Sequence, residues 1–524
     1  METSDYWAKP VFGRERVIPS LDELIAEQDP VRIFEEILDA VDWSPWEALY
    51  KRTGRGQPPI HPRYVAAGIL YGLYRGIRSS RRLEEACGYR FDFMWLVENR
   101  RIDHTTFAKF RTKFHAPLKD LFRQIGRMAM NLGLIRLCEV AFDGTRVKAN
   151  NSRYKTRTAK TLEEKLRALD ELFEQLTAKV DAADAAEEDL GSPTRLPEEL
   201  ADAQRRREKL KQALAKAKAA DEARRKQGIN PEKNPAQVPT TDVDSKVMPN
   251  KEGGYAANYT PTAITDGHEG FIVDDDVLAE VNEGPAAVAG VERIEENFGR
   301  KPEKLLTDAG NNSGQIMQEM EQLSVEFYAP ATCGQPQEGN PAKRDDPTQP
   351  VPQSEWSKLP RSKQGKLDKS SFVYDAEKDQ YYCPQGHAMP LEKTKPDQRG
   401  GETVTLQVYR CDACVGCPLA AACLSPQSKH GRTITRDPYE EVRERTAARM
   451  ATDSGRQLYN QRPRIAETTF GILKSVMGLR QFLLRGLEKV KTEWRWATTA
   501  FNIIKLVRAI GRMRAASGKL AATS

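Results

Sequence analysis

Apolar residues recur at helical spacing through the first part of the chain, over residues 1–135. The run over residues 62–75 carries four of them three or four positions apart: Val65, Ile69, Leu70 and Leu73. A side chain that returns to the same face about every 3.6 residues is typical of a helix packed on one side. The pair Ser79-Ser80 that follows is a helix start signal. We therefore predict a helical N-terminal domain over residues 1–135.

One predicted helix of this domain carries both aromatic and basic residues. Asp103 is a natural N-cap for a helix that runs to residue 114, and three phenylalanines line one side of it: Phe107, Phe110 and Phe114. Three cations lie elsewhere on the same helix: Lys109, Arg111 and Lys113. They could belong to a helix-turn-helix element that reads DNA, or they could form an ordinary solvated basic face. The pattern fits both interpretations equally well.

The apolar spacing becomes heptad-like over residues 161–217. It falls into two series: Leu162, Leu166, Leu169, Phe173, Leu176 and Val180, then Leu196, Leu200, Ala203, Leu210, Leu214 and Ala217. A Gly191-Ser192-Pro193 break separates the series, so we predict two antiparallel helices that form a hairpin insertion over residues 159–226. Such a hairpin is either a protrusion that pairs only with itself, which is the commoner case, or an arm that binds a partner.

Strand-like and helical segments alternate on both sides of this hairpin. The strand-like runs cover residues 137–142, 255–264, 270–281, 304–307 and 325–328, and the second and third form a β-hairpin. Helices are expected around residues 287–294, from residue 312, around Glu467 and over residues 488–514. Alternation of this kind predicts an α/β fold, with a mixed sheet flanked by helices. Residues 136–158 and 240–330 would form the sheet, and residues 456–515 the helices that close it.

Bulk composition narrows the class of protein. The chain has 524 residues, of which 39% are hydrophobic and 30% charged, and its formal net charge is +6. This length allows two or three domains, and the mild positive charge permits nucleic acid as a partner without requiring it. No apolar run approaches the length of a membrane span, and residues 1–12 lack the features of a signal peptide. We expect a folded cytoplasmic protein with no membrane partner.

Residues 331–455 form a second predicted insertion, which is rich in cysteine. Residues 332–371 are polar and indicate a loop or linker, whereas five of the eight cysteines lie between Cys383 and Cys423. Their spacing is typical of a zinc ribbon, so we expect a Zn²⁺ site. The preferred ligands are Cys383, Cys414, Cys417 and Cys423, with Cys411 and His387 as alternatives. An iron-sulfur cluster and reduced thiols without metal are the other interpretations.

Three acidic residues are the candidate catalytic groups. Asp143 and Asp308 each close a strand-like run, and Glu467 is expected to open a late helix. Carboxylates brought together in this way are the oxygen ligands that a pair of Mg²⁺ ions prefers. Arg146 and Lys148 follow Asp143 and are suited to a phosphate backbone. Metal-dependent cutting and joining of nucleic acid is the chemistry that this set favours.

The helix around Glu467 carries the most specific pattern. Glu467, Gly471, Lys474 and Gly478 recur at helical spacing and would form one stripe. An intrahelical ion pair would explain the two charged residues but not the glycines, which weaken a helix. A stripe of this kind leaves room for a ligand to lie against the helix.

Several motifs resemble those of bacterial insertion-sequence DDE transposases. The tyrosine-arginine-glutamate-lysine signature of that family is similar to the series Tyr459-Asn460-Gln461-Arg462, Glu467, Phe470-Gly471, Lys474 and Arg485-Gly486-Leu487. The family's first and second acidic motifs resemble Phe142-Asp143-Gly144-Thr145 and Leu306-Thr307-Asp308-Ala309-Gly310. The gap between Arg462 and Glu467 is one residue longer than in many members. The resemblance extends to residues 60–134 and to the cysteine cluster, and it implies a ribonuclease-H-like catalytic core.

This resemblance also implies an activity and a set of roles. Asp143, Asp308 and Glu467 would be catalytic and would hold Mg²⁺ or Mn²⁺, while Tyr459, Arg462 and Lys474 would contact DNA. The implied reaction is DNA strand cleavage and strand transfer at the terminal inverted repeats of a mobile element. Its partners would be double-stranded DNA at the element ends and target, and a second copy of the chain, in the bacterial cytoplasm at the nucleoid. An inactive DNA-binding derivative and a nuclease without strand transfer are the alternatives.

Overall fold

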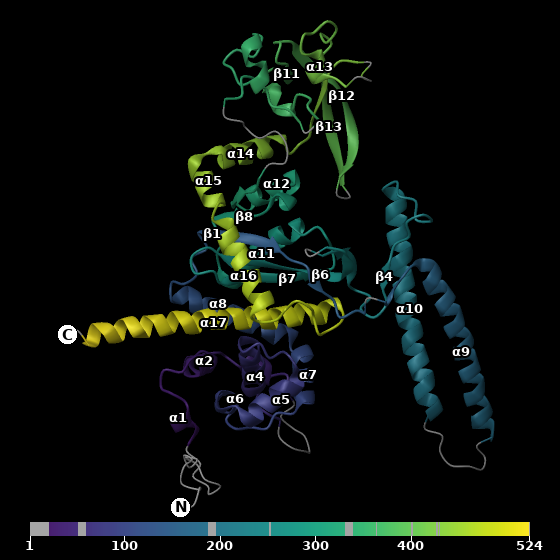
Figure 1. Cartoon of the computed structure of the whole chain (residues 1–524), viewed down its shortest axis with the longest axis vertical. Helices are drawn as coiled ribbons and strands as arrows, with labels where there is room; N and C mark the ends of the chain where they lie inside the picture. The colour runs from purple at the N-terminus through teal and green to yellow at the C-terminus, as the bar shows by residue number, and fades with distance from the viewer. Residues whose placement is uncertain are drawn as a thin grey trace, which may run out of the picture.

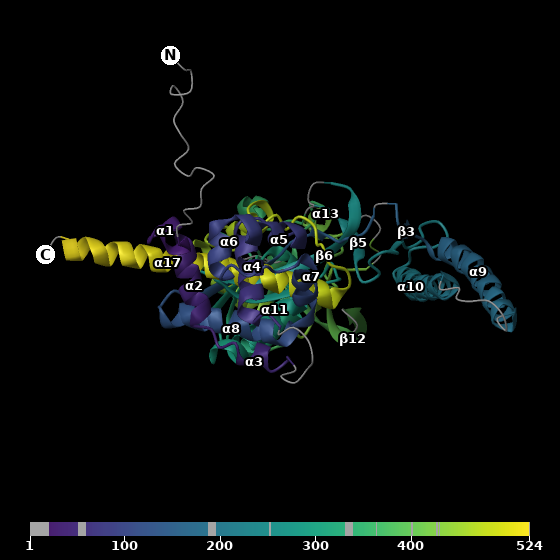
Figure 2. The same ribbon diagram turned by 90° about the horizontal axis from the view of Figure 1, so that it is seen from below.

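The computed structural model describes residues 20–50, 59–152, 154–186, 195–250, 253–330, 339–362, 364–399, 402–425, 428 and 430–522. The predicted Gly191-Ser192-Pro193 break and residues 1–12 lie outside this part of the chain. A mixed sheet lies at the centre, with the N-terminal helices on one side of it and the Cys-rich domain at the opposite end (Figure 1). The helical hairpin stands apart from this body in both views (Figures 1 and 2). The predicted α/β architecture is confirmed.

The described residues between 20 and 131 are helical wherever they form regular structure. The helices are α1 (Leu21–Leu24), α2 (Pro30–Asp39), α3 (Ser44–Glu47), α4 (Pro62–Tyr74), α5 (Ser80–Tyr89), α6 (Phe91–Leu96), α7 (His104–Lys113) and α8 (His115–Asn131). Asp103 caps α7 as predicted, because its carboxylate accepts a hydrogen bond of 2.7 Å from the Thr105 amide. Trp46 stacks on Phe110, with 5.4 Å between ring centroids. The aromatic face of α7 therefore belongs to the core of this helical domain.

The central sheet combines antiparallel and parallel strands. Its main strands are β1 (Glu139–Gly144), β6 (Tyr255–Asp266), β7 (Ile272–Leu278), β8 (Lys304–Leu306) and β9 (Glu326–Tyr328). They lie in the order β7-β6-β1-β8-β9; β6 is antiparallel to β1 and β7, whereas β8 is parallel to β1 and β9. Two short strands, β2 (Val147–Lys148) and β5 (Lys246–Pro249), pair with the start of β6. The predicted β-hairpin is confirmed in β6 and β7.

Helices cover both faces of this sheet. The helices beside it are α11 (Gly284–Phe298), α12 (Gly314–Gln322), α16 (Arg462–Ser475) and α17 (Leu487–Ala522), and a 3₁₀ helix η2 (Ala309–Asn311) precedes α12. Ile264 and Thr265 are neighbours on β6 and point to opposite faces. A Cβ built on Gly290 of α11 would lie 2.6 Å from Ile264, whereas Thr265 Oγ1 lies 3.4 Å from Thr469 Oγ1 of α16. The two helices therefore lie on opposite faces of the sheet.

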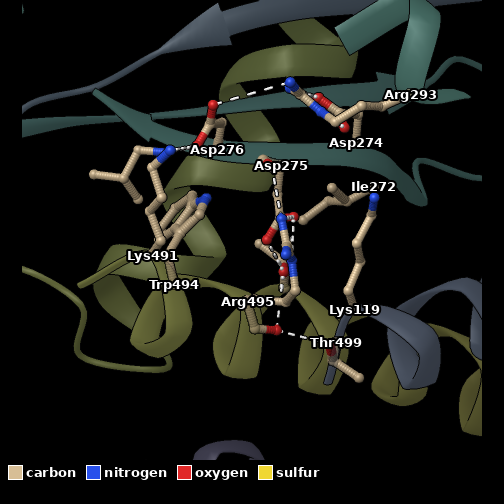
Figure 3. Close-up of polar contacts among 12 residues, drawn as sticks. Lys119, Ile272, Asp274, Asp275, Asp276, Arg293, Lys491, Trp494, Arg495 and Thr499 are labelled. Atoms are coloured by element: carbon tan, nitrogen blue, oxygen red, sulfur yellow. Dashed lines mark hydrogen bonds and ion pairs between the residues drawn. The ribbon is translucent and has the colours of Figure 1, made fainter. Parts of the chain in front are cut away.

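Buried ion pairs attach α11 and α17 to β7 (Figure 3). The Arg293 guanidinium donates hydrogen bonds of 2.8 and 2.6 Å to the two carboxylate oxygens of Asp274. On the other face, Arg495 Nε and Thr498 Oγ1 donate to Asp275 at 2.9 and 2.7 Å. Burial raises the pKa of Asp274 to about 7, and the bonds from Arg293 oppose that rise. Asp274 and Asp275, which are neighbours on β7, thus hold α11 on one face of the sheet and α17 on the other.

The Cys-rich insertion folds as a domain with its own core. Five antiparallel strands follow one another in sheet order: β10 (Val373–Asp375), β11 (Gln380–Tyr382), β12 (Ala388–Arg399), β13 (Glu402–Arg410) and β14 (Thr433–Arg436). Short helices η3 (Gln353–Lys358), η4 (Lys369–Ser371) and α13 (Ala420–Cys423) accompany them, and α14 (Glu440–Ala451) and α15 (Asp453–Tyr459) lead on to α16. Val351, Leu359 and Leu367 are buried in this core. The described residues between 339 and 371 are largely irregular, as expected of a loop, apart from η3 and η4, but their apolar side chains pack in the core of this domain.

The helical hairpin consists of α9 (Ala159–Ala186) and α10 (Arg195–Lys226). Its buried cluster joins Leu162, Ala213 and Ala217 to Val238, which lies on β4 (Val238–Pro239) beside β3 (Thr156–Arg157). An ion pair of 2.7 Å between Lys216 and Asp244 also ties the base of the hairpin to the body. In the described part of the chain, no helix is long and apolar enough to span a membrane.

Candidate active site

Asp143 and Asp308 lie side by side because of the strand register. In the parallel pair β1–β8, Ala141 lies opposite Leu306. Asp143 comes two residues after Ala141, and Asp308 comes two residues after Leu306. The carboxyl ends of parallel strands meet at one edge of a sheet, so the two side chains reach the same place. The expectation that both aspartates close strands agrees with this geometry. Asp143 is buried, with 9% of its surface exposed.

A third carboxylate lies with these two, and it is Glu283. Ligand oxygens of Asp143, Glu283 and Asp308 all lie within 4.8 Å of one another. Glu283 is the residue before α11, where the chain returns from β7. Sequence reasoning missed it because a glutamate before a Gly-Pro helix start is common and carries no distinctive pattern. Only the path of the β7–α11 connection brings it to the strand ends.

Gly144 leaves the space that Glu283 occupies. A Cβ built on Gly144 would lie 1.5 Å from Oε2 of Glu283. No side chain fits there while the Glu283 carboxylate keeps its place. The Asp143-Gly144 pair, which taken alone indicates only a turn, therefore lies at the end of a strand, with a glycine required by a close approach.

Asp308 is held by its own loop. It caps the 3₁₀ helix η2, and its Oδ1 accepts hydrogen bonds from the Gly310 amide at 3.0 Å and from Asn311 Nδ2 at 2.8 Å. Asn311 is buried and also donates to Thr307 Oγ1 at 3.1 Å. The small residues after Asp308 were expected to let a phosphate approach the backbone. In the structure, the Gly310 amide is used to orient the carboxylate.

Arg462 reaches the carboxylate cluster from the first turn of α16. Its Nη2 lies 3.2 Å from Oδ1 of Asp143, and the residue is buried to 9% exposure. The Nε atom is buried and has no hydrogen-bond partner. A buried guanidinium group whose Nε–H has no acceptor is suited to bind an anionic ligand, to which it would donate a hydrogen bond.

Tyr459 lies at the same place, just before α16. It is partly buried, and its pKa is raised by burial and by the charges of Asp308 and Asp143, while Arg462 acts in the opposite direction. The tyrosine of the predicted signature therefore lies close enough to both aspartates to be affected by their charges, and the arginine contacts Asp143. This proximity comes from the turn that joins α15 to α16.

Glu467 is exposed and is not among the three clustered carboxylates. It was expected to open its helix, but α16 begins at Arg462, so Glu467 lies in the second turn. The predicted stripe is only partly present, because Gly478 follows the helix with a φ of 72° and serves as a turn residue. Gly471 faces open space. The outer face of α16 is thus free of side-chain crowding at Gly471.

The other predicted DNA-binding residues have structural contacts. Lys474 Nζ donates hydrogen bonds to Thr145 Oγ1 at 2.5 Å and to the Arg146 carbonyl at 3.0 Å. Arg146 donates to Thr260 Oγ1 at 2.7 Å and to the Val281 carbonyl at 3.1 Å. These bonds tie α16 and the loop before Glu283 to the end of β1. Lys148 is exposed on β2.

Five cysteines of the Cys-rich domain line one cavity of about 20 Å³, a volume suited to a single ion or water: Cys383, Cys411, Cys414, Cys417 and Cys423. A hydrogen bond from the Cys411 thiol lowers the pKa of Cys383 to about 6, so one thiolate forms readily. Thiolate sulfur is a preferred ligand of Zn²⁺. The chemical type of these donors therefore suits zinc. His387, an alternative ligand, is exposed and does not line this cavity.

Two transposase-domain families match parts of the chain. The family described as Transposase DDE domain matches residues 382–507, and the family described as Transposase domain (DUF772) matches residues 19–113. The first segment runs from the Cys-rich domain through α16 into α17, and the second includes helices α1 to α7. Together the two matches support a transposase of the DDE class.

Similarity to a solved structure is low. The piggyBac transposase synaptic complex with hairpin DNA is similar at 11% identity and a TM-score of 0.29, over 92% of this chain and 75% of that chain. A TM-score this low supports no conclusion about fold or function. No curated protein matches the chain.

Proposed function

We propose that the protein binds the terminal inverted repeats of a mobile element and catalyses DNA strand cleavage and strand transfer with divalent metal. The observation that carries the proposal is the register of β1 and β8, which places Asp143 and Asp308 together at one edge of the sheet. The match to a DDE transposase domain supports the same conclusion.

The sheet topology supports a ribonuclease-H-like core for this reaction. Three antiparallel strands, β1, β6 and β7, are followed by β8 and β9, which are parallel to β1. The catalytic carboxylates in this proposal are Asp143, Asp308 and Glu467. Glu467 lies on α16, the helix that also brings Arg462 to Asp143.

Asp143 and Asp308 offer hard oxygen donors, so the residues present fit Mg²⁺ or Mn²⁺. A divalent ion held there would stabilise negative charge on the oxygens of the reacting phosphodiester. Arg462, which is buried beside Asp143, would orient a phosphate through its Nε–H and terminal amino groups. Tyr459 would pack against the DNA end, and Lys474 would keep the β1 end in place through Thr145.

A single assay tests the proposal. Full-length protein is incubated with a duplex that carries the element end, a target duplex and Mg²⁺, and nicked and joined products are separated on denaturing gels. We expect both products, and we expect Asp143→Asn to abolish both while duplex binding persists. Binding without any product in the wild-type protein would identify an inactive derivative. Cleavage without joined product would identify a nuclease.

Pairing of two element ends also implies at least two copies of the chain on DNA. We therefore propose that a homodimer forms on the paired ends. Sedimentation of the protein with and without end duplex measures this directly, and a single copy per two ends would contradict it.

A further inference from the structure

We propose that Glu283 is a metal-binding carboxylate of the catalytic centre, in addition to the two aspartates and Glu467. The inference rests on the proposed function, because it concerns the same metal site. Its starting point is geometric: the oxygens of Asp143, Glu283 and Asp308 lie within 4.8 Å of one another. One ion placed between them would contact all three groups.

The position of Glu283 is fixed by the loop that carries it. Arg146 Nη2 donates a hydrogen bond of 3.1 Å to the Val281 carbonyl, and the Gly284 amide donates to Asn282 Oδ1 at 3.1 Å. A Cβ on Gly284 would lie 2.5 Å from Ile316 of α12, so this residue must also be small. Contacts on both sides of Glu283 thus hold its backbone.

The direction of the Glu283 side chain depends on Gly144, which has no side chain of its own. Its carboxylate lies where a Cβ of Gly144 would be, next to Asp143 on the same strand. A glycine at this position lets the glutamate reach the strand end. Two separate glycines, Gly144 and Gly284, therefore accommodate the carboxylate and its loop.

The surroundings of the cluster suit a ligand that carries both positive and negative charge. Three carboxyl groups this close repel one another, and a further cation placed among them would reduce that repulsion. Arg462 contacts Asp143 from α16, and its buried Nε has no acceptor. A metal ion that carries a phosphate oxygen would supply the cation for the carboxylates and the acceptor for Arg462. The second requirement is independent of the first, since it comes from a different residue and a different element.

Mn²⁺ binding by the full-length protein without DNA tests the inference. Free Mn²⁺ is measured by electron paramagnetic resonance during titration of wild type, Glu283→Gln, Asp143→Asn and the control Glu280→Gln. Glu280 is exposed and pairs with Lys246 at the surface, so its replacement should leave affinity unchanged. We expect Glu283→Gln to weaken Mn²⁺ binding by about 10-fold or more.

Gly144→Ala provides a second variant that keeps every charge. The added methyl group would displace the Glu283 carboxylate, so we expect a loss of Mn²⁺ affinity similar to that of Glu283→Gln. Circular dichroism confirms that the variants compared are folded.

The outcomes separate this inference from the proposed function. Mn²⁺ affinity within twofold of wild type for Glu283→Gln, together with a clear loss in Asp143→Asn, would overturn the role of Glu283 and leave the catalytic centre intact. Unchanged affinity in Asp143→Asn as well would overturn the metal centre itself.

Discussion

At the residue scale, the contact between Arg462 and Asp143 would, under the proposed function, link the binding of DNA phosphate to the binding of metal. The guanidinium group contacts a carboxylate that would hold the ion, and a phosphate would compete for the same group. If phosphate draws Arg462 away from Asp143, that carboxylate becomes a better metal ligand, and each ligand then raises the affinity for the other by the same factor. DNA and metal are therefore expected to bind cooperatively.

We predict that Arg462→Gln weakens binding of the end duplex and lowers its salt dependence. Loss of one phosphate contact should reduce the slope of log K against log salt concentration by about 1. Fluorescence anisotropy in EDTA measures DNA binding without the metal contribution. Arg445→Gln is the matched control, because Arg445 is exposed and pairs with Glu321 on the surface of α12. An unchanged slope in Arg462→Gln would rule out a phosphate contact.

The two aspartates could be predicted from the sequence, whereas Glu283 could not. Each aspartate follows an apolar run that forms a strand, and strand ends are where polar groups gather in such sheets. Glu283 precedes a helix, and nothing local marks it. Its proximity depends on the missing side chain of Gly144, 139 positions away, and on a loop path that periodicity does not determine.

At the element scale, β7 is the strand on which the charges of α11 and α17 converge. Asp274 is buried and paired with Arg293, and its pKa of about 7 lies above its ordinary value. A folded-state pKa raised in this way means that the contribution of Asp274 to stability is full at low pH and is lost as pH rises through about 7. Arg293 limits that loss by stabilising the ionised carboxylate.

We predict that Arg293→Met destabilises the protein more at pH 8 than at pH 5.5. At pH 8 the variant leaves a buried carboxylate without its cation, which costs about 3–5 kcal/mol. At pH 5.5 Asp274 is mostly protonated in both proteins, so the difference should shrink. Thermal unfolding at both pH values measures it. Arg445→Met should change stability by less than about 1 kcal/mol at either pH, and an equal effect of Arg293→Met at both values would contradict the assignment.

We predict that the helical hairpin can be shortened without loss of the metal site. Joining residue 167 to residue 212 through a short Gly-Ser turn removes the outer parts of α9 and α10. It keeps Leu162, Ala213 and Ala217 at the buried base. Mn²⁺ affinity should then remain within twofold of wild type. A loss of end-duplex affinity in this variant would show that the hairpin is an arm that binds DNA, and unchanged affinity would show that it does not bind the end duplex. A lost metal site would contradict the prediction.

Helices and strands with strong periodicity could be predicted from the sequence. Features that depend on packing between distant segments could not. The hairpin strands and α4, α7 and α17 follow the expected pattern closely. The segment before β10 is largely irregular, as expected, but its apolar residues are buried, which their wide spacing did not indicate. The end of α16 at Ser475 could not be anticipated either, since Gly478 also fits a helical stripe.

At the scale of the whole molecule, the Cys-rich domain lies between β9 and the helix that carries Arg462. It therefore separates the strands of the central sheet from α14, α15 and α16 along the chain. Lys369 of η4 pairs with Glu440 of α14 at 2.8 Å, which links this domain to the returning helices.

We predict that the protein as purified contains one Zn²⁺ in this domain. Native mass spectrometry should detect one zinc per chain, and Cys417→Ser or Cys423→Ser should remove it, because both sulfurs line the shared cavity. Cys138→Ser is the control, since Cys138 lies just before β1 and outside that cavity. Protein that binds no metal, or that binds iron, would contradict the prediction.

The position of α16 and α17 late in the chain has a consequence for synthesis. The face of β6 that meets Thr469 and Trp494 stays uncovered until residues beyond 462 have left the ribosome. Arg462 and Glu467 arrive in the same interval, long after Asp143 and Asp308. A nascent chain therefore carries an open sheet and an incomplete centre until α16 and α17 have been made. The proposed catalytic centre is complete only when α16 and α17 have folded onto that sheet.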